Sequence, residues 1–189
     1  GRSNKHYGVE GSSSSSSSYD FYASGSGANY GPFTGSHDGL LVKSLQVSVG
    51  DLLMSTGKFE KTSVSNTIPY LSPSNCMSKA VYGVFIGRDV LKANRPAALK
   101  HIEDDAYLDM TNKYDRAVVN ALGEGQINVC SHNGDFEVGD FICTSDIPGK
   151  GMRYDGQDMR YVVAKCMENV KWDEEESNVK MVACIYMCG

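Results

Sequence analysis

One short phrase occurs twice in this chain, and it constrains the fold more than any other feature. Residues 47–55 (VSVGDLLMS) and 136–144 (FEVGDFICT) share the same order of apolar residues, Gly-Asp and a final hydroxyl residue. Each copy is followed at a distance by another apolar run, residues 80–86 and residues 160–166 respectively. Two copies are fewer than a solenoid needs. We therefore expect a compact all-β head made of two pseudo-repeated hairpin units.

The second copy lies next to the strongest hairpin signal in the sequence, Asn133-Gly134. A two-residue type I′ turn requires positive φ at both central positions, and Asn and Gly tolerate it at the least cost. In such a hairpin Val129 would face Val138 across the two arms. The pattern therefore predicts a central hairpin around this turn.

The aspartates of the two copies, Asp51 and Asp140, allow two interpretations. Two carboxylates can form a catalytic dyad, as in glycosidases, where they face each other across a cleft. An Asp that follows Gly in a turn more commonly accepts hydrogen bonds from the backbone. No other sequence feature indicates such a cleft, so we expect a structural role for both residues and no enzymatic activity.

Composition and charge exclude several classes of partner. The 189 residues carry a formal net charge of −5 without a basic stripe, whereas phosphate binding needs clustered Lys and Arg, so we expect no nucleic-acid partner. No apolar run approaches the roughly 20 residues of a membrane helix, so we expect no membrane insertion. Short runs of β-branched and aromatic residues, with few prolines, favour strands over helices.

The six cysteines are widely spaced, lack any CxxC pair and mostly lie inside apolar runs. Cysteine in such runs behaves as a small buried hydrophobic residue. Reduced thiols are typical of a chain that folds in a cytosol. Cys130 and His132 come closest to the spacing of zinc ligands, but they flank a tight turn. We therefore expect no metal and no cofactor.

Two stretches of the head look unlike strands. Residues 58–78 are polar, contain two prolines and predict a loop. In residues 88–114, Pro96 fits the first position of a short helix over residues 97–102, and the acidic cluster that follows predicts a solvated insertion. The terminal run, residues 179–187, alternates enough to predict a last strand.

The first 30 residues differ from all that follow. Seven consecutive serines, residues 12–18, are flanked by aromatic residues that include Tyr7, Tyr19 and Phe21. A single chain of this composition cannot bury enough apolar surface to offset its ordering entropy, whereas three chains wound together can. We therefore expect residues 1–30 to form a Ser/Gly/aromatic segment of a fibrous trimeric β stalk. The β-rich C-terminal head domain would then comprise residues 31–189.

The junction between these segments contains Ser36, His37 and Asp38, the residue types of a catalytic triad. The members of a triad must converge in space, whereas three consecutive residues generally point apart. We expect them to satisfy backbone groups in a winding, glycine-rich crossing from stalk to head. They are nevertheless the candidates for self-cleavage.

Four stretches of the sequence resemble the C-terminal domains of bacteriophage tail fibre and tailspike proteins of the pre-neck appendage type. These stretches are residues 29–41 (NYGPFTGSHDGLL), 122–130 (LGEGQINVC), 139–152 (GDFICTSDIPGKGM) and 183–189 (ACIYMCG). The resemblance implies a homotrimeric structural protein of the virion, folded in the host cytoplasm and joined on its N-terminal side to the rest of the tail fibre. The motifs consist of glycines, turns and strands, and they name no catalytic residue.

The resemblance implies a module that caps and trimerises the fibre and binds a glycan or protein of the host surface. Candidates for that contact are the aromatic residues Tyr30, Phe33, Tyr154 and Trp172. Because related domains include intramolecular chaperones, the alternative is a self-cleaving chaperone domain for fibre trimerisation. Ser145 and Lys150 resemble the Ser-Lys dyad of endosialidase-type chaperones, although they lie mid-domain beside a Pro-Gly turn. An independent hydrolase of cell-surface glycan is the third hypothesis.

Overall fold

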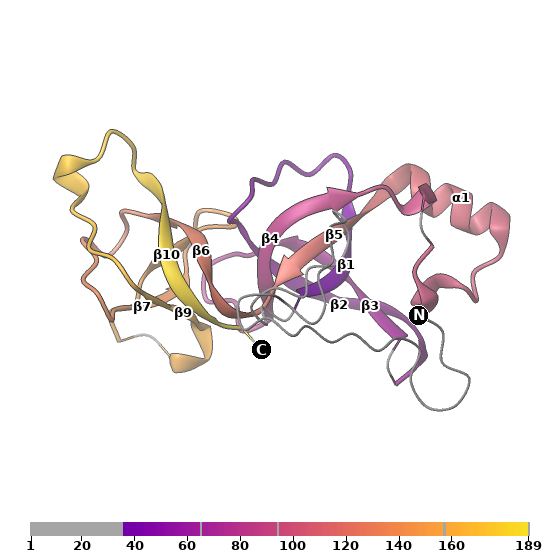
Figure 1. The fold of residues 1–189 in the computed structure, drawn as a ribbon, viewed down its shortest axis with the longest axis horizontal. Helices are drawn as coiled ribbons and strands as arrows, with labels where there is room; N and C mark the ends of the chain where they lie inside the picture. Colours follow the sequence, from indigo (N-terminus) through magenta and orange to yellow (C-terminus); the bar gives the residue numbers. More distant parts are fainter. Residues whose placement is uncertain (1–35, 65, 94, 157, 189) are drawn as a thin grey trace, which may run out of the picture. The chain divides into compact units, whose positions relative to one another are not determined.

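The computed structural model describes residues 36–188 except residues 65, 94 and 157 (Figure 1). This part of the chain is mainly β, as predicted, with ten strands and one α-helix. The strands are β1 (Ser36–Val42), β2 (Leu52–Ser63), β3 (Asn66–Pro73), β4 (Val81–Asp89), β5 (Tyr114–Asn120), β6 (Leu122–Cys130), β7 (Phe141–Thr144), β8 (Gly151–Arg153), β9 (Val162–Cys166) and β10 (Val179–Met187). The last strand has the predicted bounds.

The first five strands close into a barrel in the order β1-β3-β2-β4-β5. β1 runs parallel to β3 and antiparallel to β5, and the remaining pairs are antiparallel. Alternate side chains of a strand point to opposite faces, so each strand contributes its inward set to a shared core. Leu41, Leu53, Phe85 and Val119 are buried in this core.

The last five strands close into a second barrel in the order β6-β8-β7-β9-β10. β6 runs parallel to β8 and antiparallel to β10, and the remaining pairs are antiparallel. Ile127, Phe136, Ile142 and Val182 belong to its buried core. A single residue, Ala121, separates β5 from β6.

A helical insertion between β4 and β5 differs from the predicted one. The helix expected over residues 97–102 is limited to a 3-10 turn, Ala97–Leu99, after Pro96. The acidic segment beyond it forms α1 (Asp104–Lys113), a largely exposed helix within the predicted solvated insertion, with two aspartates in its first turn, where negative charge favours a helix. The insertion packs against Leu40 of β1 in a separate apolar cluster.

Residues 58–78 do not form the predicted loop. Their first part continues β2, and β3 returns beside it as an antiparallel strand. The two prolines that suggested a loop lie within β3, where Pro69 is opposite Phe59 and Pro73 is opposite Leu53. The register shifts between β2 and β3, and proline is tolerated at strand positions of this kind because its missing N–H interrupts no regular ladder.

The predicted central hairpin is wrong, although its turn has the predicted backbone. Asn133 and Gly134 have φ values of 66° and 84°. However, β6 pairs with β10 along its whole length and with β8, so no local arm is available to it. Phe136 forms only an isolated bridge with Val170. Val138, expected on a shared face with Val129, is 63% exposed.

The cysteines contribute to the core of the second barrel. Cys130, Cys143, Cys166 and Cys184 are buried, whereas Cys76 is exposed. Burial raises the pKa of the Cys143 and Cys184 thiols to about 12. These thiols therefore stay neutral in the folded protein at a pH at which an unfolded thiol is ionised.

Stability is expected to fall as the pH rises from about 9 to about 12, because the unfolded thiols release protons over that range and the buried ones do not. At pH 8 one thiol, that of the exposed Cys76, is expected to react at once with Ellman's reagent, and Cys76→Ser removes this fast phase. Urea unfolding at a series of pH values checks the first expectation, and thiol counting with and without urea checks the second. A fast phase that persists in Cys76→Ser would contradict the assigned burial.

Two glycines of β4 provide a matched test of the barrel closure. Gly83 has a φ of +151°, and a Cβ there would lie 2.4 Å from the backbone oxygen of Asn120. Gly83→Ala is expected to cost about 2–4 kcal/mol of unfolding free energy through backbone strain and overpacking. Gly87→Ala has open space around the added methyl group and is expected to be near neutral. Urea unfolding followed by circular dichroism measures both changes, and equal losses would refute the assigned contact.

Candidate functional site

The two barrels meet at a buried carboxylate. Asp51, in the turn before β2, is 5% exposed. Its Oδ2 accepts a hydrogen bond from the Ser48 N–H at 3.0 Å, and its Oδ1 accepts one from the Asn128 side chain at 2.7 Å. The Lys150 ammonium forms an ion pair with the same carboxylate. The second barrel thus supplies a carboxamide from β6 and a cation from the β7–β8 loop.

Backbone hydrogen bonds extend this contact. The Asn128 N–H donates to the carbonyl of Gly50 at 2.9 Å, and the Leu52 N–H donates to the carbonyl of Gly149 at 2.7 Å. Gly149 has a φ of +77°, and a Cβ there would lie 3.1 Å from the Asp51 Cβ. Glycine is therefore needed at this position for the β7–β8 loop to approach the aspartate so closely.

The turn before β7 repeats the internal geometry of the turn before β2. In the second barrel the Glu137 N–H donates to Asp140 Oδ2 at 2.9 Å, the Gly139 N–H to the Cys166 carbonyl at 2.9 Å, and the Cys166 N–H to the Asp140 carbonyl at 2.8 Å. In the first barrel the Ser48 N–H correspondingly donates to Asp51 Oδ2 at 3.0 Å. The Gly50 N–H donates to the Phe85 carbonyl at 2.9 Å, and the Phe85 N–H donates to the Asp51 carbonyl at 2.8 Å. Both Asp residues thus accept hydrogen bonds within their own turns, as expected.

The surroundings of the two turns differ. Asp51 is buried under the second barrel, whereas Asp140 is half-buried and Gly139 is exposed. No hydrogen bond or ion pair joins the two aspartates among residues 36–188, setting aside the undescribed positions 65, 94 and 157. The two carboxylates therefore serve two separate turns.

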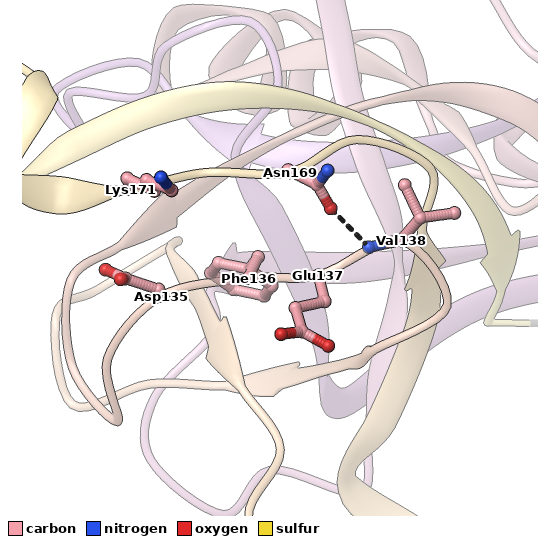
Figure 2. Close-up of a pocket in the computed structure, with 6 residues that line it drawn as sticks. All are labelled: Asp135, Phe136, Glu137, Val138, Asn169 and Lys171. Carbon is pink, nitrogen blue, oxygen red and sulfur yellow. Dashed lines mark hydrogen bonds between the residues drawn. The ribbon is translucent and has the colours of Figure 1, made fainter.

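A pocket of about 450 Å³ opens beside the second turn (Figure 2). Its lining consists of Asp135, Phe136, Glu137, Val138, Asn169 and Lys171. The Asn169 side chain reaches across the pocket, and its oxygen accepts a hydrogen bond from the Val138 N–H at 2.9 Å. The lining combines two carboxylates, one ammonium group and an exposed valine, so it can take a polar ligand or a protein side chain.

Two of the aromatic residues predicted to contact the host have structural contacts. The indole N–H of Trp172 donates to the Gly134 carbonyl at 2.9 Å, and its backbone N–H donates to Asp135 at 3.0 Å. Trp172 is thereby fixed next to the pocket and packs on the barrel core. The ring of Tyr154 packs edge-on against Phe141, with the ring centroids 6.4 Å apart. The other two, at positions 30 and 33, lie outside the described residues.

The triad candidates lie on β1, not in a winding crossing, because residues 36–42 pair with β5 along their whole length. Successive strand residues point to opposite faces, so the side chains of His37 and Asp38 lie on opposite sides of β1. The His37 ring lies 5.8 Å from the Tyr82 ring, and Asp38 lies 3.5 Å from the Arg116 guanidinium. Burial raises the pKa of Asp38, while Arg116 opposes that rise. His37 and Asp38 thus have separate partners, and the side chain of Ser36 lies outside the described part of the structure.

Ser145 and Lys150 do not form a dyad either. The Ser145 hydroxyl donates to the carbonyls of Ile147 and Lys150, at 3.1 Å and 2.9 Å, and so stabilises the β7–β8 loop. His132 pairs with Asp146 at 2.7 Å. Across the described ranges no three His, Cys, Asp or Glu side chains are grouped to hold a metal ion.

No helix in the described part of the chain has the length and apolarity to cross a membrane. No protein-family model, curated protein or solved structure matches this chain. The site is therefore defined by its own geometry. The inter-barrel contact at Asp51 was missed at the level of sequence, where the only signal was the repeated Gly-Asp phrase.

The two aspartates are expected to contribute very differently to stability. Asp51→Ala leaves the half-buried Lys150 ammonium without its carboxylate and takes one of two acceptors from the buried Asn128 carboxamide, and it is expected to cost about 3–5 kcal/mol. Asp140→Ala removes one backbone cap at the surface and is expected to cost about 1 kcal/mol. Asp51→Ala combined with Lys150→Met is expected to recover part of the loss. Urea unfolding of the three variants checks the order, and equal costs for the two aspartates would contradict it.

Proposed function

We propose that this chain is the C-terminal module of a trimeric bacteriophage tail fibre or tailspike. It would cap and trimerise the fibre, bind the host surface and form part of the virion after folding in the host cytoplasm. The four sequence stretches that resemble such domains support this proposal, as does the serine- and aromatic-rich segment of residues 1–30.

The observation that carries the proposal is the apolar outer face of β10. The strand directs Val182, Cys184 and Tyr186 into the barrel, so the alternate residues face outward. Outward residues of an antiparallel strand are usually polar. Here they are Met181, Ala183, Ile185 and Met187, and the three larger ones are 38–46% exposed.

Leu122 of β6 extends this apolar face. It pairs with Met187 and is 38% exposed. Soluble monomers seldom leave extended apolar patches exposed, and such patches commonly mark subunit interfaces. We infer that sister chains cover this face in a homotrimer.

We also infer that the two barrels are copies of one unit, which deepens the structural role. The strand orders β1-β3-β2-β4-β5 and β6-β8-β7-β9-β10 place corresponding strands in corresponding positions. The corresponding strands β2 and β7 each follow a Gly-Asp turn, and Gly50 and Gly139 have φ values of 90° and 99°. A structural module that extends a fibre can be built by stacking such units end to end.

The oligomeric state tests this proposal directly. The full chain is expected to have a native mass three times its 20.5 kDa chain mass. Ile185→Glu is expected to reduce the trimer to monomer while the circular dichroism spectrum is retained, because a buried unpaired carboxylate destabilises an interface. Met159→Glu, at an exposed methionine on another segment, serves as the matched control and is expected to stay trimeric. A wild-type chain that is monomeric in analytical ultracentrifugation would refute the trimer.

The alternative, a self-cleaving chaperone domain, is separated by a second measurement. Intact-mass spectrometry of the complete fibre is expected to give one uncleaved polypeptide. A fragment that begins near Ser36 and disappears in Asp38→Asn would instead favour self-cleavage.

A further inference from the structure

The two Gly-Asp turns present the same hydrogen-bond acceptors, but only those of the first turn are bonded to another barrel. In the first barrel, three groups receive hydrogen bonds or an ion pair from the second barrel. They are the carbonyls of Val49 and Gly50 and Oδ1 of Asp51. All donors belong to two residues, Asn128 and Lys150.

The same three acceptors are uncovered in the second barrel. They are the carbonyls of Val138 and Gly139 and Oδ1 of Asp140, and no described residue donates to any of them. Val138 is 63% exposed. The pocket of Figure 2 adjoins Val138, and its charged lining residues are Asp135, Glu137 and Lys171. This end of the second barrel is thus rich in uncovered acceptors.

The opposite end of the first barrel explains why the stack is directional. In the first barrel, Leu40 and Tyr70 come one residue before Leu41 and Leu71, which are paired between the parallel strands β1 and β3. In the second barrel, Asn128 and Lys150 come one residue before Val129 and Gly151, the corresponding pair between β6 and β8. The donor positions of the second barrel therefore correspond to apolar and aromatic residues in the first. Leu40 is fully buried, and the helical insertion packs over it and Tyr70.

The described chain is therefore capped at one end and open at the other, as repeat arrays commonly are at one terminus. No second Asn-Lys donor surface is free, because the one pair is already bound to Asp51. A second copy of this chain cannot reproduce the contact at Asp140 without giving up its own. The occupant therefore brings its own donors from outside residues 36–188.

We propose that the turn at residues 138–140 is a docking site for a β-barrel of the same kind on another polypeptide. That partner presents a backbone N–H, an asparagine-type carboxamide and a lysine ammonium in the positions that Asn128 and Lys150 occupy over Asp51. The lysine of the partner complements the Asp140 carboxylate, and the adjacent pocket carries two carboxylates, Asp135 and Glu137, against one ammonium group, Lys171. The proposal rests on the contact between the barrels and does not depend on trimer formation.

The end of β10 provides a way to test this surface with a defined probe. Asn120 of β5 pairs with Val84 of β4, and Ile185 of β10 pairs with Lys165 of β9. Because Val84 and Lys165 hold corresponding positions in the two barrels, Asn120 corresponds to Ile185. Leu122, where the second barrel begins, therefore corresponds to Met187. We therefore consider a fused protein in which a second copy of residues 122–189 follows Tyr186. Its added barrel then follows the second barrel in the same way as the second barrel follows the first.

In the fused protein, the added barrel is expected to dock on residues 138–140. Asp140→Ala is then expected to raise the unfolding constant by about two to four orders of magnitude, as Asp51→Ala does, against about tenfold or less in the natural chain. The amide protons of Val138–Asp140 are expected to exchange at least tenfold more slowly than in the natural chain. An added barrel that leaves both quantities unchanged overturns the proposal.

A matched control carries Asn128→Leu and Lys150→Met only in the added barrel. This control is expected to fold, and the amide protons of residues 138–140 are expected to exchange at the rates of the natural chain. Asp140→Ala is then expected to raise the unfolding constant no more than it does in the natural chain. Docking that survives without both donors also overturns the proposed chemistry.

A second measurement needs no fusion. The isotope-labelled natural chain is titrated with a cyclic peptide of residues 145–151 (SDIPGKG), the loop that contacts Asp51. Expected are amide shift changes centred on residues 138–140 that are lost in Asp140→Ala and with a Lys→Met peptide. Absence of these changes, or equal changes upon concentrating the natural chain alone, would overturn the proposal, the latter assigning the face to a second copy.

Discussion

The arrangement of the described chain depends on one buried carboxylate. A charge as buried as that of Asp51 is tolerated only when it is paired and hydrogen-bonded, and here both requirements are met from the second barrel. The first barrel alone gives this carboxylate the Ser48 N–H as a donor, and its other partners, Asn128 and Lys150, belong to two segments of the second barrel. The contact therefore links the packing of one barrel to the correct folding of its neighbour, across a linker of one residue.

The Gly-Asp turn has two separable tasks. Its internal hydrogen bonds set the start of a strand, and they are the same at Asp51 and at Asp140. Its outward acceptors bind a neighbouring barrel, and only those of the first copy are covered. A short motif with a positive-φ glycine can therefore be both a folding element and a connector.

The sequence predicted the parts of the fold that local chemistry determines. The bounds of β10 follow from its alternation, and the positive φ of Asn133 and Gly134 follows from residue type. The central hairpin failed because the partner of β6 is β10, about 50 residues later, and no local pattern reveals such a pairing. The acidic segment was expected to be a solvated insertion, but its helix, α1, was missed because it depends on charge at its first turn and on packing, not on an apolar period. The site at Asp51 was missed since its two donors are distant in sequence.

The two interaction surfaces proposed for this chain do not compete. The apolar residues of β10 project sideways from the wall of the second barrel, because they alternate with its core residues. The acceptors of residues 138–140 lie in a turn before β7, hence at the end of a strand and not on the wall. Sideways association of identical chains buries apolar area, whereas end-on docking satisfies polar groups, so each surface has the chemistry suited to its task. The proposed fibre role calls for both kinds of contact, since the units of a fibre must be bundled side by side and extended end to end.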